Sequence, residues 1–127
     1  MARKMTIDSN IVIAYLAGEK AVVQALSEWK SDGASLFLST IVETEVLSFN
    51  KWPAHERTAV EFFLEREFIS VPFDRTVSRM AALVRRNQPI KLPDAAIAAT
   101  AIYTNSPLVT RNVRDFRNIQ GLEIMHL

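Results

Sequence analysis

The chain contains no cysteine, only two histidines, and no apolar run long enough to cross a bilayer. Without cysteine, disulfide bonds, thiolate metal sites and a cysteine nucleophile are all excluded, and this absence suits a reducing cytoplasm, where we expect the protein to reside. No apolar stretch approaches the roughly 18 residues of a transmembrane helix. Asp8 and Asn10 interrupt the apolar N-terminal stretch that a signal peptide would need. The sequence therefore indicates neither secretion nor a membrane.

Several phosphoryl-transfer motifs are also missing. There is no GxxxxGK[ST] and no GxGxxG, which argues against nucleotide binding. A receiver domain would carry paired acids after its first strand, and a haloacid-dehalogenase-like phosphatase would carry Asp-x-Asp. The sequence here is Asp8-Ser9-Asn10, so neither class fits.

The composition is that of one ordinary globular domain spanning residues 1–127. Hydrophobic residues make up 49% and charged residues 23% of the chain, and the net charge is +1. Basic residues nevertheless gather between positions 75 and 117, where the acids are Asp94 and Asp115 and the cations are Arg75, Arg79, Arg85, Arg86, Lys91, Arg111, Arg114 and Arg117. They form either solvated helix faces or a phosphate-attracting surface around an acidic centre.

Short apolar runs alternate with amphipathic segments along the chain. We expect strands at 4–7, 36–38, 68–71, 107–110 and 122–125, and helices at 9–18, 21–29, 41–50, 54–67, 74–86, 93–103 and 113–118, with Ser9 or Asn10 capping the first helix. This alternation predicts an α/β domain with a mainly parallel sheet. Ligands of such sheets lie outside the carboxyl ends of the strands. Asp8 and Asp115 both fall there.

Glu45 is the acid whose position most clearly requires a partner. On the expected helix it lies within about 60° of Ile41, Val42 and Phe49, whereas Glu43 points about 160° away. A carboxylate on a core-facing stripe costs several kcal/mol unless something pairs with it. The partner is either a buried arginine or a metal or catalytic site, and we favour the second.

The other candidate acids each have a simple structural alternative. Asp8 and Asp94 could cap the helices that follow them, and Asp115 could sit in a turn against Arg111 or Arg114. Their joint placement favours a shared site. Four carboxylates at one sheet edge would raise one another's pKa and would need cations for neutralisation.

Oxygen ligands dominate the ligand set that the sequence offers. The two histidines, His55 and His126, are expected at the surface, so the favoured ion is Mg²⁺ or Mn²⁺. Hard cations held by carboxylates suit phosphodiester hydrolysis. The candidate catalytic and metal-binding residues are Asp8, Glu45 and Asp94, with Asp115 holding a second metal or orienting water as a general base.

Four sequence blocks carry a family resemblance: IDSNIVIAYL, LSTIVETEVL, LPDAAIAATA and LVTRNVRDF. In this order and spacing they resemble the PIN-domain family, and in particular its bacterial and archaeal VapC-type toxins. The resemblance gives the same acids, with Glu45 rather than Glu43 in the second block. It adds a tier of supporting or substrate-side residues: Asn10, Thr110, Arg111 and Asn112.

The resemblance implies a PIN-like doubly wound sheet flanked by helices, Mg²⁺- or Mn²⁺-dependent endoribonuclease cleavage of RNA, a homodimer, and inhibition by a cognate VapB-type antitoxin. Ser9 stands where threonine is commoner, and Asn112 stands where the family often has an acid, so its amide brings no charge to a metal. Two alternatives remain open: a non-catalytic PIN scaffold acting as a binding or regulatory module, and a nuclease acting on DNA.

Overall fold

The computed structural model describes residues 3–127. Its centre is a five-stranded sheet in the order β3-β2-β1-β4-β5, and every neighbouring pair is parallel. The strands are β1 (Lys4–Ile7), β2 (Ser35–Ser39), β3 (Ile69–Val71), β4 (Leu108–Thr110) and β5 (Ile124–His126). The predicted α/β class with a parallel sheet is therefore confirmed.

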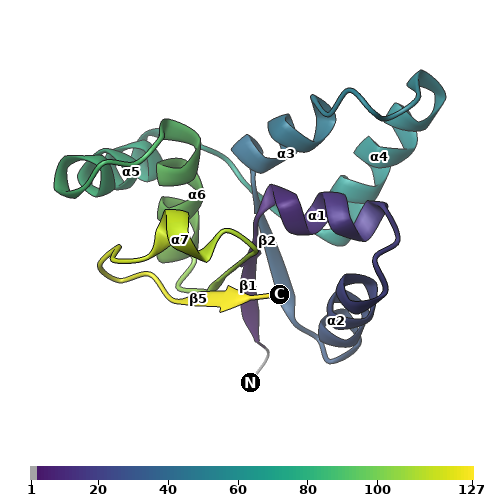
Figure 1. The fold of residues 1–127 in the computed structure, drawn as a ribbon, viewed down its shortest axis with the longest axis horizontal. Coiled ribbons are helices and arrows are strands. Elements are labelled where there is room, and N and C mark those ends of the chain that lie inside the picture. Colours follow the sequence, from purple (N-terminus) through teal and green to yellow (C-terminus); the bar gives the residue numbers. More distant parts are fainter. Residues whose placement is uncertain (1–2) are drawn as a thin grey trace.

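Helices cover both faces of this sheet. In Figure 1, the helices of the first half of the chain lie on one side of the strands and those of the second half on the other. The first group is α1 (Ser9–Leu16), α2 (Lys20–Ser31), α3 (Thr40–Leu47) and α4 (Ala54–Glu67); the second is α5 (Arg75–Asn87), α6 (Leu92–Tyr103) and α7 (Val113–Phe116). Within residues 3–127, none of these helices has both the length and the apolar character that spanning a bilayer requires.

The strand order reverses direction at the centre of the sheet. From β1 the chain moves outward to β2 and then β3, returns to β4 on the other side of β1, and continues to β5. The boundary between β1 and β4 is thus the switch point of a doubly wound sheet, where two crossovers leave in opposite directions and open a crevice at the carboxyl ends of the strands. Asp8 and Arg111 are the residues that follow these two strands.

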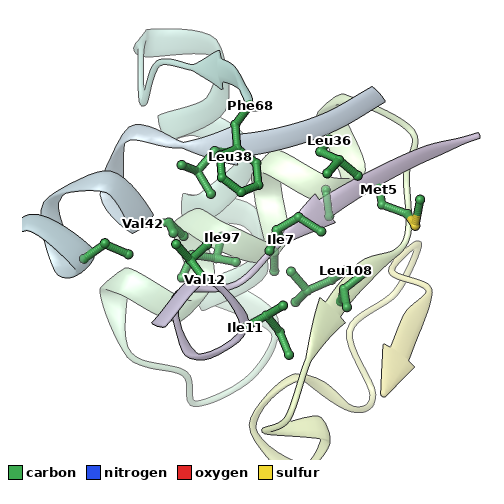
Figure 2. Close-up of a cluster of buried hydrophobic side chains, with 14 of the residues drawn as sticks. Met5, Ile7, Ile11, Val12, Leu36, Leu38, Val42, Phe68, Ile97 and Leu108 are labelled. Carbon is green, nitrogen blue, oxygen red and sulfur yellow. The ribbon is translucent and has the colours of Figure 1, made fainter. Parts of the chain in front are cut away.

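A continuous apolar core holds the two helical layers onto the strands. Figure 2 shows Met5 and Ile7 of β1 packed among side chains from β2, α1, α3 and α6. Burial of the central strands on both faces is characteristic of parallel sheets. The helix α6 contributes seven consecutive buried residues, Ala95 to Ala101, because its small side chains let the helix backbone approach the sheet closely.

Several predicted boundaries differ from the structure by a few residues; for example, α1 ends at Leu16 rather than at 18, and α7 ends at Phe116 rather than at 118. The cap of α1 is Asp8 rather than Ser9 or Asn10. The helix α3 ends at Leu47, not at residue 50, and the Trp52 indole N–H donates a 2.9 Å hydrogen bond to a carbonyl of its last turn. The last strand begins at Ile124 rather than at 122, because Leu122 closes a turn by donating its N–H to Ile119.

Candidate active site

The four predicted acids lie at the carboxyl edge of the sheet, each delivered by a different element. Asp8 ends β1, Glu45 is on α3 after β2, Asp94 is in the first turn of α6, and Asp115 is on α7 after β4. Asp8 is electrostatically coupled to Glu45, Asp94 and Asp115, and Asp94 is coupled to Glu45 and Asp115. The fold therefore brings into one neighbourhood carboxylates that are far apart in the sequence.

Asp8 is the most buried acid of this group, with 4% of its surface exposed. Its Oδ1 accepts a 2.7 Å hydrogen bond from the backbone N–H of Ser9, and its Oδ2 accepts one of 2.7 Å from the hydroxyl of Thr110. Burial raises the pKa of Asp8 in spite of these hydrogen bonds, and the negative charge of Asp115 raises it further. The capping alternative is thus correct for Asp8, but the same carboxylate also belongs to the acidic cluster.

Asn10 links the ends of the two central strands. Its amide Nδ2 donates to Asp8 Oδ2 and to Thr110 Oγ1, both at 3.3 Å, while its Oδ1 accepts from the backbone N–H of Arg111 at 3.3 Å. The backbone N–H of Asn112 donates to the Thr110 hydroxyl at 3.0 Å. The Thr110 hydroxyl therefore accepts a hydrogen bond from the backbone of Asn112 and donates its own to Asp8, which fixes the orientation of that carboxylate. The Asn112 side chain is exposed and makes no capping bond.

Glu45 is half-buried and carries an unpartnered oxygen. Its Oε1 is sealed from solvent and has no hydrogen-bond partner. Burial raises the pKa of Glu45, the charges of Asp8 and Asp94 raise it further, and hydrogen bonding to Ser9 opposes the rise. No basic side chain forms an ion pair with Glu45 within residues 3–127, so the buried-arginine alternative is wrong. An orphaned carboxylate oxygen among other acids is the feature that a bound cation would relieve.

Glu43, on the same helix, has a separate role. Its Oε2 accepts a 3.0 Å hydrogen bond from the Ser70 hydroxyl, which ties α3 to β3 away from the acidic cluster. The predicted separation of Glu43 from Glu45 is therefore seen in their contacts. One part of the helical-face argument was wrong, because Phe49 lies beyond the end of α3.

Asp94 and Asp115 form the more open side of the cluster. Asp94 is half-buried and does not cap α6, since Lys91 occupies the N-cap position. Burial raises the pKa of Asp94, and so do the charges of Asp8 and Asp115, while the Lys91 ammonium lowers it. Asp115 is exposed and forms no ion pair within the described residues. Asp94 lies in the first turn of α6, where the helix dipole favours a negative charge, but it does not cap the helix. The proposed pairing of Asp115 with an arginine is not formed within residues 3–127.

Within residues 3–127, Arg111 and the two histidines form no ion pair with an acid of the cluster. Arg111 forms a 2.7 Å ion pair with Glu19, which follows α1. Sequence reasoning missed Glu19, and no local pattern could have shown it because the contact joins distant parts of the chain. His55 and His126 are both exposed, as predicted.

The donor chemistry of the cluster fits a hard divalent cation. It offers carboxylate oxygens, one of them orphaned, in a setting where burial and mutual repulsion both penalise the charged form. Within residues 3–127, the side chains as they stand form no group of three or more that would hold a metal ion by themselves. The cluster thus offers charge and oxygen atoms rather than a closed coordination cage.

A doubly wound parallel sheet with an acidic cluster at its switch point defines a class of α/β proteins, and comparison narrows this class to one family. The family model described as PIN domain matches residues 5–122. The chain belongs to the PIN-domain family.

Two ribonucleases from other organisms match nearly the whole chain. Ribonuclease VapC1 of Rickettsia felis is 31% identical over 131 residues, covering 95% of this chain and 94% of its own. Ribonuclease VapC19 of Mycobacterium tuberculosis is 32% identical over 121 residues, covering 92% and 95%.

Solved structures share the same fold. A toxin–antitoxin complex from Klebsiella pneumoniae matches with a TM-score of 0.79 and 30% identity, over 93% of this chain and 94% of that one. VapBC2 from Rickettsia felis, bound to a DNA fragment from its promoter, matches with a TM-score of 0.81 and 22% identity, over 98% of both chains.

Proposed function

We propose that this protein is a cytoplasmic, Mg²⁺- or Mn²⁺-dependent endoribonuclease, the toxin of a toxin–antitoxin pair that a VapB-type antitoxin neutralises. The observation that carries the proposal is the set of four mutually repelling acids, one of which, Glu45, has a buried Oε1 without a hydrogen-bond partner. The relatives named ribonucleases and the related toxin–antitoxin complexes support the activity and the kind of partner. A homodimer is part of the same proposal.

Each acid has a role that follows from its surroundings. Asp8 caps α1 and accepts a hydrogen bond from Thr110, so it serves as the rigid ligand around which the others are arranged. Glu45 and Asp94 are the further ligands, and exposed Asp115 is free to orient the attacking water or accept its proton. When bound, the cation supplies a more acidic water and neutralises charge on the phosphoryl group.

The open arrangement of the acids suits Mg²⁺. This ion usually retains several waters and is bound by one or two carboxylates together with substrate phosphates. A cage of three convergent protein ligands is therefore unnecessary, and the RNA phosphate would complete the coordination.

The proposal is tested by incubating the purified protein with total RNA, with Mg²⁺, with Mn²⁺ or with EDTA, beside the Asp8→Asn variant. We expect cleavage with either metal, none with EDTA, and a loss of at least about 10²-fold in Asp8→Asn, since the charge is lost and the amide nitrogen can no longer accept the hydrogen bond that Thr110 donates to one carboxylate oxygen. Circular dichroism of Asp8→Asn checks that the fold is retained.

The controls separate the remaining alternatives. Cleavage that survives both EDTA and Asp8→Asn would contradict the four-acid mechanism, and no cleavage under any condition would favour the non-catalytic scaffold. Single-stranded DNA of matched sequence distinguishes a DNA nuclease, which would cut it at least as fast as RNA.

The partner and the oligomeric state need separate measurements. Co-expression with the product of the adjacent open reading frame should yield a complex that elutes as one species in size-exclusion chromatography. Light scattering of the protein purified alone should give the mass of a dimer. Induction in a host with and without that reading frame tests toxicity.

A further inference from the structure

A polar cleft opens beside the exposed side of the acidic cluster. It has a volume of about 440 Å³, within the range of about 300–1,000 Å³ of small-molecule sites. One wall is the connection between α5 and α6, and the other is α7 with the turn that follows it. The lining residues are Gln88, Pro89, Ile90, Lys91, Asp94, Arg114, Asp115, Arg117 and Asn118.

Three cations face this cleft: Lys91, Arg114 and Arg117. All three are exposed, and within residues 3–127 none of them takes part in an ion pair. Lys91 is close enough to Asp94 to lower the pKa of that carboxyl group. Cations of the kind that bind phosphates thus line the same cleft as Asp94 and Asp115, two of the acids that the proposed reaction uses.

Two amide side chains, those of Gln88 and Asn118, also line the cleft. Gln88 is half-buried at the C-terminal end of α5, and Asn118 is exposed with a φ of +70° in the turn after α7. Neither amide makes a side-chain hydrogen bond to the rest of residues 3–127. An amide offers both a donor and an acceptor, the pattern that reads the edge of an unpaired base.

The wall that carries Gln88 is held in place rather than loose. The Nε–H of Arg85 donates a 3.2 Å hydrogen bond to the carbonyl of Ile90, which fastens the α5–α6 connection to α5. The neighbouring Pro89 restricts the same connection, because its φ is fixed by its ring. The α5–α6 wall of the cleft is therefore restrained by contacts within the protein itself.

We propose that this cleft is a nucleotide subsite for single-stranded RNA immediately next to the phosphodiester that is cleaved. Lys91, Arg114 and Arg117 hold the backbone phosphate, and Gln88 and Asn118 contact the base and set the sequence preference at that position. This inference rests on the proposed ribonuclease activity, but its binding part can be tested without cleavage.

The first test measures binding in EDTA. Fluorescence anisotropy with a labelled single-stranded oligoribonucleotide of mixed sequence compares the wild type with the Arg114→Gln/Arg117→Gln double variant at several salt concentrations. We expect affinity to fall about tenfold or more, and the slope of log affinity against log salt to become shallower by about 0.7 for each lost phosphate contact. The control is Arg79→Gln, since Arg79 is an exposed arginine of α5 outside the cleft and should match wild type.

The second test concerns sequence preference. A random RNA pool is cleaved with Mg²⁺, and the new 5′ ends are sequenced for wild type, Gln88→Ala and Asn118→Gly. Glycine removes the Asn118 amide at a backbone conformation that glycine adopts freely. We expect both variants to lose selectivity at one nucleotide beside the cut, while Asn87→Ala and Gln120→Ala, which remove amides outside the cleft, keep the wild-type profile.

The outcomes separate this inference from the proposed function. Metal-dependent cleavage with unchanged profiles in both amide variants would overturn the base-contacting role and leave the ribonuclease intact. Equal RNA affinity in the double arginine variant and wild type would overturn the phosphate-binding role. The binding result tests the phosphate-binding role of the cleft even if the wild type cleaves nothing.

Discussion

The hydroxyl of Thr110 donates a 2.7 Å hydrogen bond to Oδ2 of Asp8, and this bond joins the end of β4 to the end of β1. Both side chains are buried, at 0% and 4% exposure. The bond crosses the switch point of the sheet and sets the orientation of the most buried acid. It connects the stability of the fold to the arrangement of the candidate site.

Thr110→Val tests this connection with little change in shape. Removing the hydroxyl leaves the buried Asp8 with one donor fewer, so we expect a loss of about 1–3 kcal/mol in the free energy of unfolding. We also expect the rate of RNA cleavage to fall at least about tenfold, because the carboxylate loses its fixed orientation. Urea denaturation and single-turnover cleavage measure the two effects.

The matched control is Thr100→Val. Thr100 is equally buried, but its hydroxyl donates only to the carbonyl of Ala96 within α6. This variant should cleave RNA at the wild-type rate. Equal losses of activity in both threonine variants would mean that Thr110 has no particular role in positioning Asp8.

A second prediction separates the two glutamates of α3. Glu45→Gln should reduce cleavage by at least about 10²-fold, because it removes a charge from the proposed metal-binding cluster. Glu43→Gln should remain within about twofold of wild type, because Glu43 contacts Ser70 and not the cluster. Initial rates at saturating Mg²⁺ provide the comparison. Similar losses in both variants would show that the site extends over a different face of α3.

A third prediction concerns pH in the absence of divalent ions. The raised pKa values of Asp8, Glu45 and Asp94 mean that the folded state holds these protons more tightly than the unfolded state. Their contribution to stability is therefore fully present below the ordinary carboxyl values of about 4, and it is lost as the pH rises through the raised values. In EDTA, Glu45→Gln should melt at a higher temperature than wild type at pH 7, with a smaller difference at low pH.

Differential scanning calorimetry across the acid-to-neutral range measures this effect. Glu43→Gln is the control and should follow the wild-type curve. Adding Mg²⁺ should raise the melting temperature of wild type at pH 7 more than that of Glu45→Gln, because the cation offsets the same repulsion. A Glu45→Gln variant that melts below wild type in EDTA at pH 7 would contradict the proposed electrostatic strain.

A fourth prediction concerns the ion pair between Glu19 and Arg111. Both side chains are partly exposed, at 47% and 39%, so breaking the pair should cost less than about 1 kcal/mol of stability. Glu19→Gln frees the Arg111 guanidinium beside the site, and we expect tighter RNA binding and a lower KM with kcat little changed. Steady-state kinetics at low and high salt measure this, and the gain should shrink with salt. A fall in kcat with unchanged KM would point instead to Glu19 as a support for the backbone of Arg111.

Much of the fold followed from local pattern. Alternating strands and helices gave the α/β class, and the rule for parallel sheets placed Asp8 and Asp115 at the same edge. The helical period distinguished Glu45 from Glu43 before any contact was known. These features are encoded within a few residues of one another, so a single sequence is enough to reveal them. The catalytic roles of the four acids remain predictions.

What the sequence could not show depends on contacts between distant segments. Two contacts arise only when the chain is folded. One is the hydrogen bond that Trp52 donates to the last turn of α3, and the other is the ion pair between Glu19 and Arg111. The sequence offered Asp8 as a helix cap or as a site residue, and only the folded structure shows that this carboxylate is both. The cleft beside Asp94 likewise exists only where α6 and α7 meet.

The position of β4 between β1 and β5 also has a consequence during synthesis. A ribosome adds about 5–20 residues each second and the N-terminal part emerges first, so a growing chain displays Asp8, Glu45 and Asp94 before Thr110 exists. Until β4 has paired with β1, that edge of β1 is open and Asp8 lacks the hydrogen bond from Thr110. If the proposed function is correct, a nascent or prematurely terminated chain would therefore leave the RNA around it intact, and RNA cleavage would begin only after nearly all of the protein has been made.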